Sequence, residues 1–335
     1  MADWKSVLKA DPTAWLLGED NPSVRLLTLT EILDRPSGDP DVRAARAEIM
    51  ERGIVPRILA RQNPDGSWDK PDALYTAKYK GAVWQLLILA ELGADGNDPR
   101  VRKAGEFILK NSQDRAGGGF AMHRSVKSGG GRATEVIPCL TGNMAWSLIH
   151  LGFGDDPRLA RAIDWIAKVQ RYDDGEAEAP RGEPYEKFRI CWGKHSCHMG
   201  VVKALKALAG IPPKKRSAPV RRSIGEGVEY LLKHHIYKKS HDLSRIAKPG
   251  WLRFGFPLMY QDDILEILDI LLRLGVKDPR MREAVDIVAS KQDAAGTWVL
   301  ENTFNGRFQV DIEKKGKPSK WITLRALNVL KMYYS

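Results

Sequence analysis

Three cysteines and two of the seven histidines are the side chains of this 335-residue chain best suited to hold a metal ion. Cys191, His195, Cys197 and His198 lie in one segment, CWGKHSCH, and Cys139 lies 58 residues before Cys197. Thiolate sulfur and imidazole nitrogen are the ligands that zinc prefers in a tetrahedral site. The pattern predicts a zinc site made by Cys139, Cys191, Cys197 and His198, with His195 as the second choice for the histidine.

The number of protein ligands would decide what zinc does there. Three ligands with an open fourth position would let the metal polarise a carbonyl or activate water or another nucleophile, whereas four ligands would make a structural site. Two alternatives need no metal. The cysteines can be small buried apolar residues beside hydrogen-bonded histidines, or one can be a nucleophilic thiolate stabilised by a helix N-terminus and an adjacent histidine.

A second group of candidates is acidic or basic. Asp262 and Asp263 open the segment DDILE, which looks like the acidic pairs that hold Mg²⁺ in enzymes that ionise a diphosphate. Acidic residues are also common in a first helical turn, where they complement the helix dipole. Asp263, Tyr260 and Lys320 are further candidates for proton transfer or contact with an anion, and His195 is a fourth catalytic candidate.

A repeat of about sixty residues must position these side chains. Asp-Pro pairs at 39–40, 98–99, 156–157 and 278–279 recur at intervals of 59, 58 and 122 residues, the last being two periods of 61. Aspartate is a good N-cap and proline fits the first turn, so each pair predicts a helix start. Gln-x3-Gly-x-Trp closures follow at Gln62 and Gln292, with a partial version at Gln113, and Leu-Gly pairs end the apolar helices.

Each repeat therefore holds one apolar helix, buried on most sides, and one amphipathic helix. We expect apolar helices near residues 23–34, 75–92, 139–151, 197–209, 260–274 and 319–333. Because the last one is as apolar as the middle ones, the pattern favours a closed all-α ring, an (α/α)6 toroid, over an open solenoid. We expect a single domain over residues 1–335, with repeats at about 20–70, 73–120, 135–175, 193–240, 256–298 and 316–335.

In such a ring the inner helices run the same way, so their N-termini line one mouth. Cys139 and Cys197 share a register position on neighbouring inner helices, and Tyr260 and Lys320 fall near the same position in the last two repeats. The positive helix ends at this mouth would favour an anionic group. Strand-like alternation is scarce and confined to short stretches such as residues 308–312.

The Gln-x3-Gly-x-Trp closures resemble the QW-type repeats of the squalene–hopene cyclase and protein prenyltransferase superfamily, over roughly residues 20–333. The resemblance implies an α/α toroid. Prenyltransferase β subunits carry zinc bound by Asp, Cys and His at the mouth, and here Cys139 or Cys197 would stand for the cysteine and His198 for the histidine. The family's Asp-x-Cys pair is absent beside either cysteine, and so is the Asp-x-Asp-Asp tetrad of cyclases that protonate a terpene.

These observations predict a zinc-dependent lyase, hydrolase or transferase that acts on a hydrophobic small molecule in the central cavity. The substrate would be an isoprenoid, as the resemblance implies, or an aromatic molecule. One alternative is a non-catalytic binding scaffold with a basic face. Another is a magnesium-dependent terpene cyclase-like activity through Asp262 and Asp263.

Composition narrows the setting. The 53 Lys and Arg residues against 42 Asp and Glu give a net charge of +11, but no groove-reading or RNA-binding motif accompanies it, so a nucleic-acid partner is not expected. The apolar runs are too short or too interrupted for a membrane span, and the first residues do not resemble a secretion signal. Three cysteines fit a reduced, cytoplasmic setting, and a homodimer is compatible with the sequence.

Overall fold

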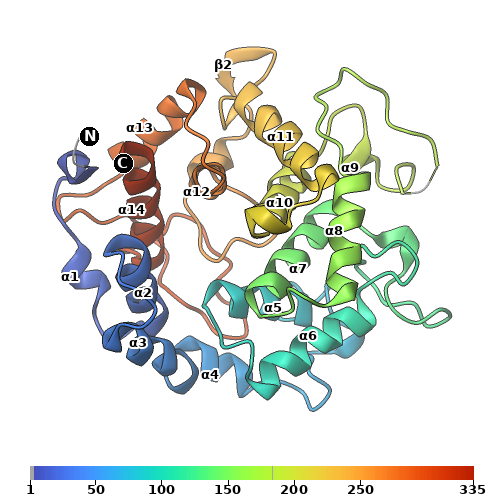
Figure 1. The fold of residues 1–335 in the computed structure, drawn as a ribbon, viewed down its shortest axis with the longest axis horizontal. Helices are drawn as coiled ribbons and strands as arrows, with labels where there is room; N and C mark the ends of the chain where they lie inside the picture. Colours follow the sequence, from blue (N-terminus) through green and yellow to red (C-terminus); the bar gives the residue numbers. More distant parts are fainter. Residues whose placement is uncertain (1–3, 183) are drawn as a thin grey trace.

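The inner wall of the fold consists of apolar helices arranged in a ring. The computed structural model describes residues 4–182 and 184–335. Within these residues the inner helices are α2 (Pro22–Leu27), continued by the π-helical turn η2 (Thr28–Ile32), α5 (Ala82–Glu91), α7 (Pro138–His150), α10 (His198–Ala209), α12 (Ile264–Arg273) and α14 (Lys320–Tyr334). Figure 1 shows them as an inner circle surrounded by a second layer of helices. The predicted all-α toroid is confirmed.

Four helical segments of the outer layer begin at the Asp-Pro pairs, as predicted. Its helices are α3 (Pro40–Glu51), α4 (Ile54–Leu59), α6 (Pro99–Asn111), α8 (Pro157–Val169), α11 (Ala218–Lys233) and α13 (Arg282–Ser290), the last preceded by the 3-10 turn η7 (Pro279–Met281). The side chains of Asp39, Asp98, Asp156 and Asp278 each accept a hydrogen bond from a backbone N–H two residues further on. These bonds satisfy N–H groups that have no partner inside the helix.

The glutamine closures fasten one outer helix to the next. The Gln62 amide donates to the carbonyl of Arg100 at 2.9 Å, and the Gln113 amide donates to the carbonyl of Arg158 at 2.7 Å, each in the first turn of the following outer helix. The indole of Trp68 donates back to the carbonyl of Ile58 at 2.9 Å. The repeated motif therefore acts as a clamp between successive repeats.

The N-terminal segment closes the ring. At the last clamp, the backbone N–H of Lys9 donates to the side chain of Gln292, and the carbonyl of Ala10 lies where a Cβ at Gly296 would stand. Helix α14 packs against α2 and η2 as well as against α12, and Lys320 pairs with Asp20. The N-terminal residues thus occupy the place that the next outer helix would take.

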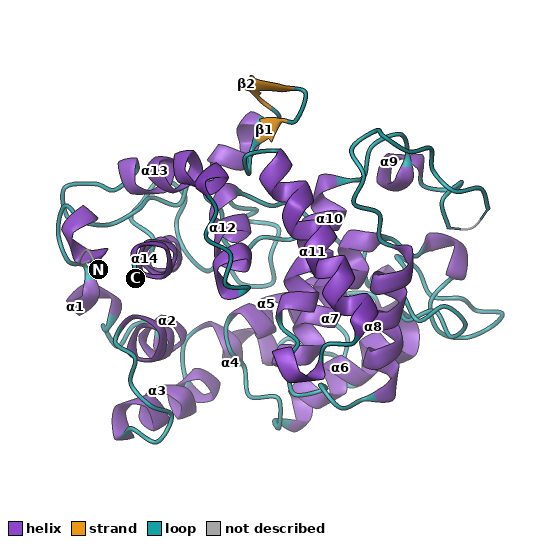
Figure 2. Cartoon of the chain, turned by 45° about the horizontal axis from the view of Figure 1, so that its top comes forward, coloured by secondary structure: helices purple, strands orange, loops and turns teal. Residues whose placement is uncertain are grey.

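Two inner helices begin later than predicted. Helix α5 starts at Ala82 because residues 73–77 fold back onto Gly81, where a Cβ would lie 2.6 Å from the carbonyl oxygen of Leu74. Helix α12 starts at Ile264 because Asp263 caps it. Residues 308–312 form no strand; the described sheet is instead a hairpin of β1 (Lys238–Lys239) and β2 (Asp242–Ile246), which stands out from the ring (Figure 2).

Short helical turns complete the described chain: η1 (Trp4–Val7), α1 (Thr13–Leu16), η3 (Pro71–Ala73), η4 (Ala133–Glu135), α9 (Arg189–Trp192), η5 (Pro213–Lys215) and η6 (Pro249–Leu252). None of the helices in the described ranges combines the length and the apolar character that crossing a lipid bilayer requires.

Candidate functional site

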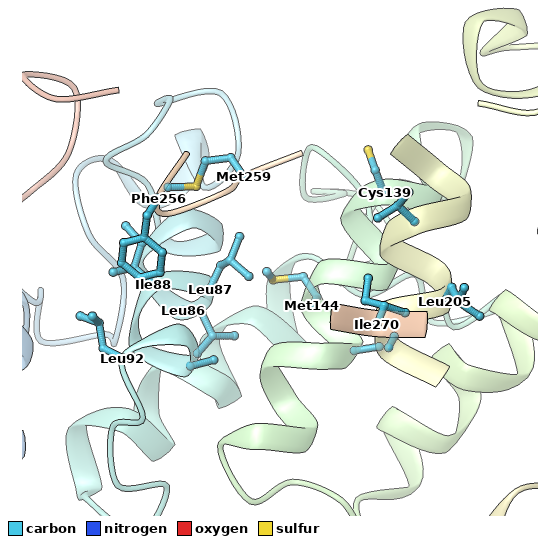
Figure 3. Close-up of a cluster of buried hydrophobic side chains, with 14 of the residues drawn as sticks. Leu86, Leu87, Ile88, Leu92, Cys139, Met144, Leu205, Phe256, Met259 and Ile270 are labelled. Carbon is cyan, nitrogen blue, oxygen red and sulfur yellow. The ribbon is translucent and has the colours of Figure 1, made fainter. Parts of the chain in front are cut away.

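The three thiols gather at the mouth formed by the helix N-termini. Cys139 lies in the first turn of α7, Cys197 is the N-cap of α10, and Cys191 lies in α9 just before it. Helices α7 and α10 pack closely along each other, and Figure 3 shows Cys139 at the end of α7 beside α10. The register that places Cys139 and Cys197 in equivalent positions therefore brings them to one place.

The thiols differ in their readiness to ionise. Interaction with the Cys191 thiol lowers the pKa of Cys197 to about 6, while the same interaction raises the pKa of Cys191. Burial, with a smaller contribution from the charge of Cys197, raises the pKa of Cys139 to about 12. Cys197 is therefore the thiolate at neutral pH, and Cys139 and Cys191 stay protonated.

His198, the first residue of α10, forms a buried pair with Asp262. Its Nδ1 lies 2.8 Å from Oδ2 of Asp262, and the two side chains are 9% and 0% exposed. The carboxylate accepts from Nδ1–H, and in the neutral imidazole this tautomer leaves Nε2 with its lone pair. Nε2 of His198 and Oδ1 of Asp262 have no hydrogen-bond partner among the described residues, and Trp251 stacks on the imidazole with ring centres 3.9 Å apart.

An aromatic cluster lies on the α5 side of the same mouth. Tyr79 packs against Trp84 with ring centres 5.1 Å apart, and Tyr260 lies 6.2 Å from Trp84. The ammonium group of Lys78 sits over the rings of both Tyr75 and Tyr260, at 4.9 and 4.6 Å. Burial and the charge of Cys139 raise the pKa of Tyr75, which places this cluster next to the thiols.

The predicted zinc ligands are neighbours, but they do not form a ready-made site. Among the described residues, no three His, Cys, Asp or Glu side chains are arranged to hold a metal ion. The donors nevertheless suit zinc, since Cys197 is a thiolate and His198 has a free nitrogen whose partner nitrogen is fixed by a carboxylate. The ligand side chains would have to move to enclose the metal.

The other predicted catalytic residues are engaged elsewhere. Asp263 is buried and accepts from the backbone N–H groups of Glu266 and Gly255, so it caps α12, and burial raises its pKa to about 7. His195 is 56% exposed and contacts Asp174, and Lys320 pairs with Asp20.

The acidic pair is divided between two partners. Asp262 contacts His198, whereas Asp263 is held by the backbone, so the two carboxylates do not face a common ligand in the described structure. Tyr260 stays at the mouth, within the aromatic cluster. A magnesium site at this pair remains a prediction.

Sequence reasoning missed a charged cavity at the opposite mouth. This charged cavity has a volume of about 540 Å³ and is lined by the C-terminal ends of α5, α7 and α10 together with one face of α12 and the first half of α14. Its charged lining residues are Glu31, Glu91, Lys206, Glu266, Asp269, Arg273 and Arg325, with Trp146, His150, Trp321 and Asn328 among the others. Such a lining differs from the mostly apolar pocket expected for a hydrophobic ligand.

Buried ion pairs connect the inner helices that line the charged cavity. The Lys206 ammonium lies 2.6 Å from Glu91 and 3.0 Å from Glu266, and Lys203, fully buried, lies 2.5 Å from Glu266. Arg325 also pairs with Glu91. The signal in the sequence was two lysines three residues apart on a helix expected to be apolar all round, since a lysine buried there requires an acidic partner.

Comparison with protein-family models finds no match, and comparison with curated proteins finds none either. Among solved structures, the chain resembles the type II terpene cyclase MstE from Scytonema in its apo form, with 17% identity and a TM-score of 0.43 over 93% of this chain and 88% of that chain. A variant of MstE in complex with its substrate geranylgeranyl dihydroxybenzoate gives 16% identity and a TM-score of 0.43 over 94% of this chain and 88% of that chain.

Proposed function

We propose that the protein is an enzyme that acts on a hydrophobic isoprenoid or aromatic molecule at the mouth formed by the helix N-termini. Cys197, His198 and Asp262 would be its reacting groups. The observation that carries this proposal is the buried His198–Asp262 pair, whose second imidazole nitrogen is free, next to a thiolate. A buried polar nitrogen without a partner is costly unless a ligand or a reacting group uses it.

Each of the three groups has a separate task in this proposal. Asp262 holds the imidazole in the tautomer that leaves Nε2 basic, and Trp251 keeps the ring in place by stacking. Nε2 of His198 then takes or returns a proton at the substrate. Cys197 would act as the nucleophile: its thiolate forms a C–S bond to an allylic carbon as the C–O bond to diphosphate breaks, and water deprotonated by Nε2 of His198 then displaces the thiolate and releases the alcohol.

The surrounding side chains suit a substrate with an apolar body and an anionic end. Tyr260, backed by the buried Tyr79 and Trp84, offers aromatic surface, and Lys78 lies over two tyrosine rings with no described carboxylate as an ion-pair partner. The positive ends of α7 and α10 add to the attraction for an anionic group.

A zinc enzyme at the same site is the second candidate. Three thiols and the free nitrogen of His198 lie at one mouth, and this grouping favours it. Cys139, Cys191, Cys197 and His198 would hold the metal, with Asp262 orienting the imidazole from outside. A bound zinc ion would supply a Lewis acid or activate a nucleophile.

One experiment separates the two candidates. The purified protein is analysed for zinc and then incubated with farnesol, geranylgeraniol and their diphosphates, and products are detected by mass spectrometry. Thiolate catalysis predicts turnover without zinc that is lost in Cys197→Ser and kept in Cys139→Ser. Zinc catalysis predicts about one zinc per chain and loss of both zinc and turnover in either variant. No turnover together with salt-dependent binding of a polyanion would instead favour the scaffold.

A further inference from the structure

The charged cavity contains balanced charge. Four lining carboxylates, from Glu31, Glu91, Glu266 and Asp269, face three lining cations, from Lys206, Arg273 and Arg325, and the fully buried Lys203, which pairs directly with Glu266, supplies the fourth. His150 adds no charge at neutral pH because burial lowers its pKa, and Asp263 lies outside the lining with both oxygens on backbone N–H groups. A ligand with a net charge would leave one charge in the cavity uncompensated, which is costly in a buried site.

Two charged side chains in the cavity keep unused hydrogen-bonding capacity. Nη2 of Arg325 donates a hydrogen bond to Glu91. No other described residue is hydrogen-bonded to the guanidinium, which has five N–H donors. Oε2 of Glu31 accepts hydrogen bonds from Arg273 and Asn328, and none of the described residues donates to Oε1. The cavity thus offers a free donor edge and a free acceptor oxygen.

These two groups are neighbours. Asn328, which donates to Glu31, lies three residues after Arg325 on α14, so their Cβ atoms lie on one face of the helix about 5–6 Å apart. Since Glu31 and Arg325 also line the same cavity, one small molecule could place a carboxylate on Arg325 and an ammonium on Glu31. The indole N–H of Trp321, which also lines the cavity and has no described partner, is a further donor.

We propose that the charged cavity binds an α-amino acid, with its carboxylate on Arg325 and its ammonium on Glu31. In an α-amino acid one carbon atom separates the two charged groups, the molecule carries no net charge from them, and each would meet a partner of opposite sign. Trp146 and Trp321 leave apolar wall for a side chain, and the volume of about 540 Å³ admits even the largest one.

The test measures binding of the twenty common L-α-amino acids to the full-length protein by thermal shift and by calorimetry. We expect at least one to bind saturably with a Kd below about 1 mM, and its decarboxylated and deaminated analogues to bind at least about tenfold more weakly. The absence of saturable binding at about 10 mM for all twenty, or equal binding of either analogue, would overturn the proposal.

Glu31→Gln is the decisive variant, since Arg273 keeps its contact with Asp269 and the fold should be retained. We expect at least about tenfold weaker binding, and the same for Arg325→Gln. Arg282→Gln, a change of the same type at an exposed outer-layer pair, should bind as the wild type does. Unchanged affinity in a folded Glu31→Gln protein would overturn the assignment, whereas Cys197→Ser should leave binding intact because it lies at the other mouth.

Discussion

The imidazole of His198 and the carboxylate of Asp262 lie 2.8 Å apart, and this contact joins the start of α10 to the residue before the cap of α12. Two neighbouring inner helices thereby share one buried polar pair at the mouth. Because the carboxylate accepts a hydrogen bond from Nδ1–H, it also decides which nitrogen of the imidazole can react.

Removal of the carboxylate should release the imidazole from this tautomer. In Asp262→Ala we expect Nε2 to gain proton occupancy and turnover to fall by a factor on the order of 10³, since the basic nitrogen is lost. Imidazole ¹⁵N chemical shifts report the tautomer directly. Asp262→Asn should change the tautomer as well, because its amide can turn and donate to Nδ1. An unchanged tautomer in both variants would contradict this role.

The reactivity of Cys197 should follow its lowered pKa. Since only the thiolate is alkylated, the iodoacetamide rate should reach half its maximum near pH 6 and stay high above it. In Cys191→Ala the midpoint should rise toward the ordinary thiol value of about 8.5, because the donor that mainly causes the lowering is removed. Mass spectrometry of the alkylated peptides separates Cys197 from Cys139 and Cys191. A Cys197 midpoint near 8.5 in the wild type would refute the assignment.

The architecture could be predicted because its signals are local. The four Asp-Pro pairs of the repeats each cap the helix that follows, and the glutamine and glycine of each closure act on the next repeat at a fixed distance along the chain. Closure of the ring followed from the apolar last helix. The N-terminal segment that occupies the final clamp could not be predicted, because it lacks the motif of an outer helix.

The site was only partly predictable. Register placed Cys139 and Cys197 together, since equivalent positions of neighbouring repeats meet in a ring. Pairing of His198 with Asp262 depends on side-chain directions across 64 residues of sequence, which periodicity does not determine. The same limit applies to Asp263, whose role as the cap of α12 follows from two backbone N–H contacts.

The ion pair of Lys203 with Glu266 should be more costly to break than to remove. Lys203→Met leaves Glu266 with Lys206 alone and should lower the free energy of unfolding by about 3 kcal/mol, as expected for a buried pair that loses one partner. The double variant Lys203→Met with Glu266→Leu should lose less than that single variant. Urea unfolding measures both, and Lys215→Met at an exposed pair should leave the midpoint unchanged. Additive losses would show that the two charges do not depend on each other.

The glutamine clamp should contribute measurably to stability wherever it reaches the next repeat. Gln113 donates to the carbonyls of Gly118 and Arg158, so Gln113→Ala should lower the free energy of unfolding by about 1–2 kcal/mol. Gln170 is the natural control, because its amide donates to the adjacent carbonyl of Arg171 and its oxygen has no described partner. Gln170→Ala should therefore cost clearly less by urea unfolding. Equal losses at the two positions would mean that the glutamines act through burial, and that bonds between repeats do not hold the ring together.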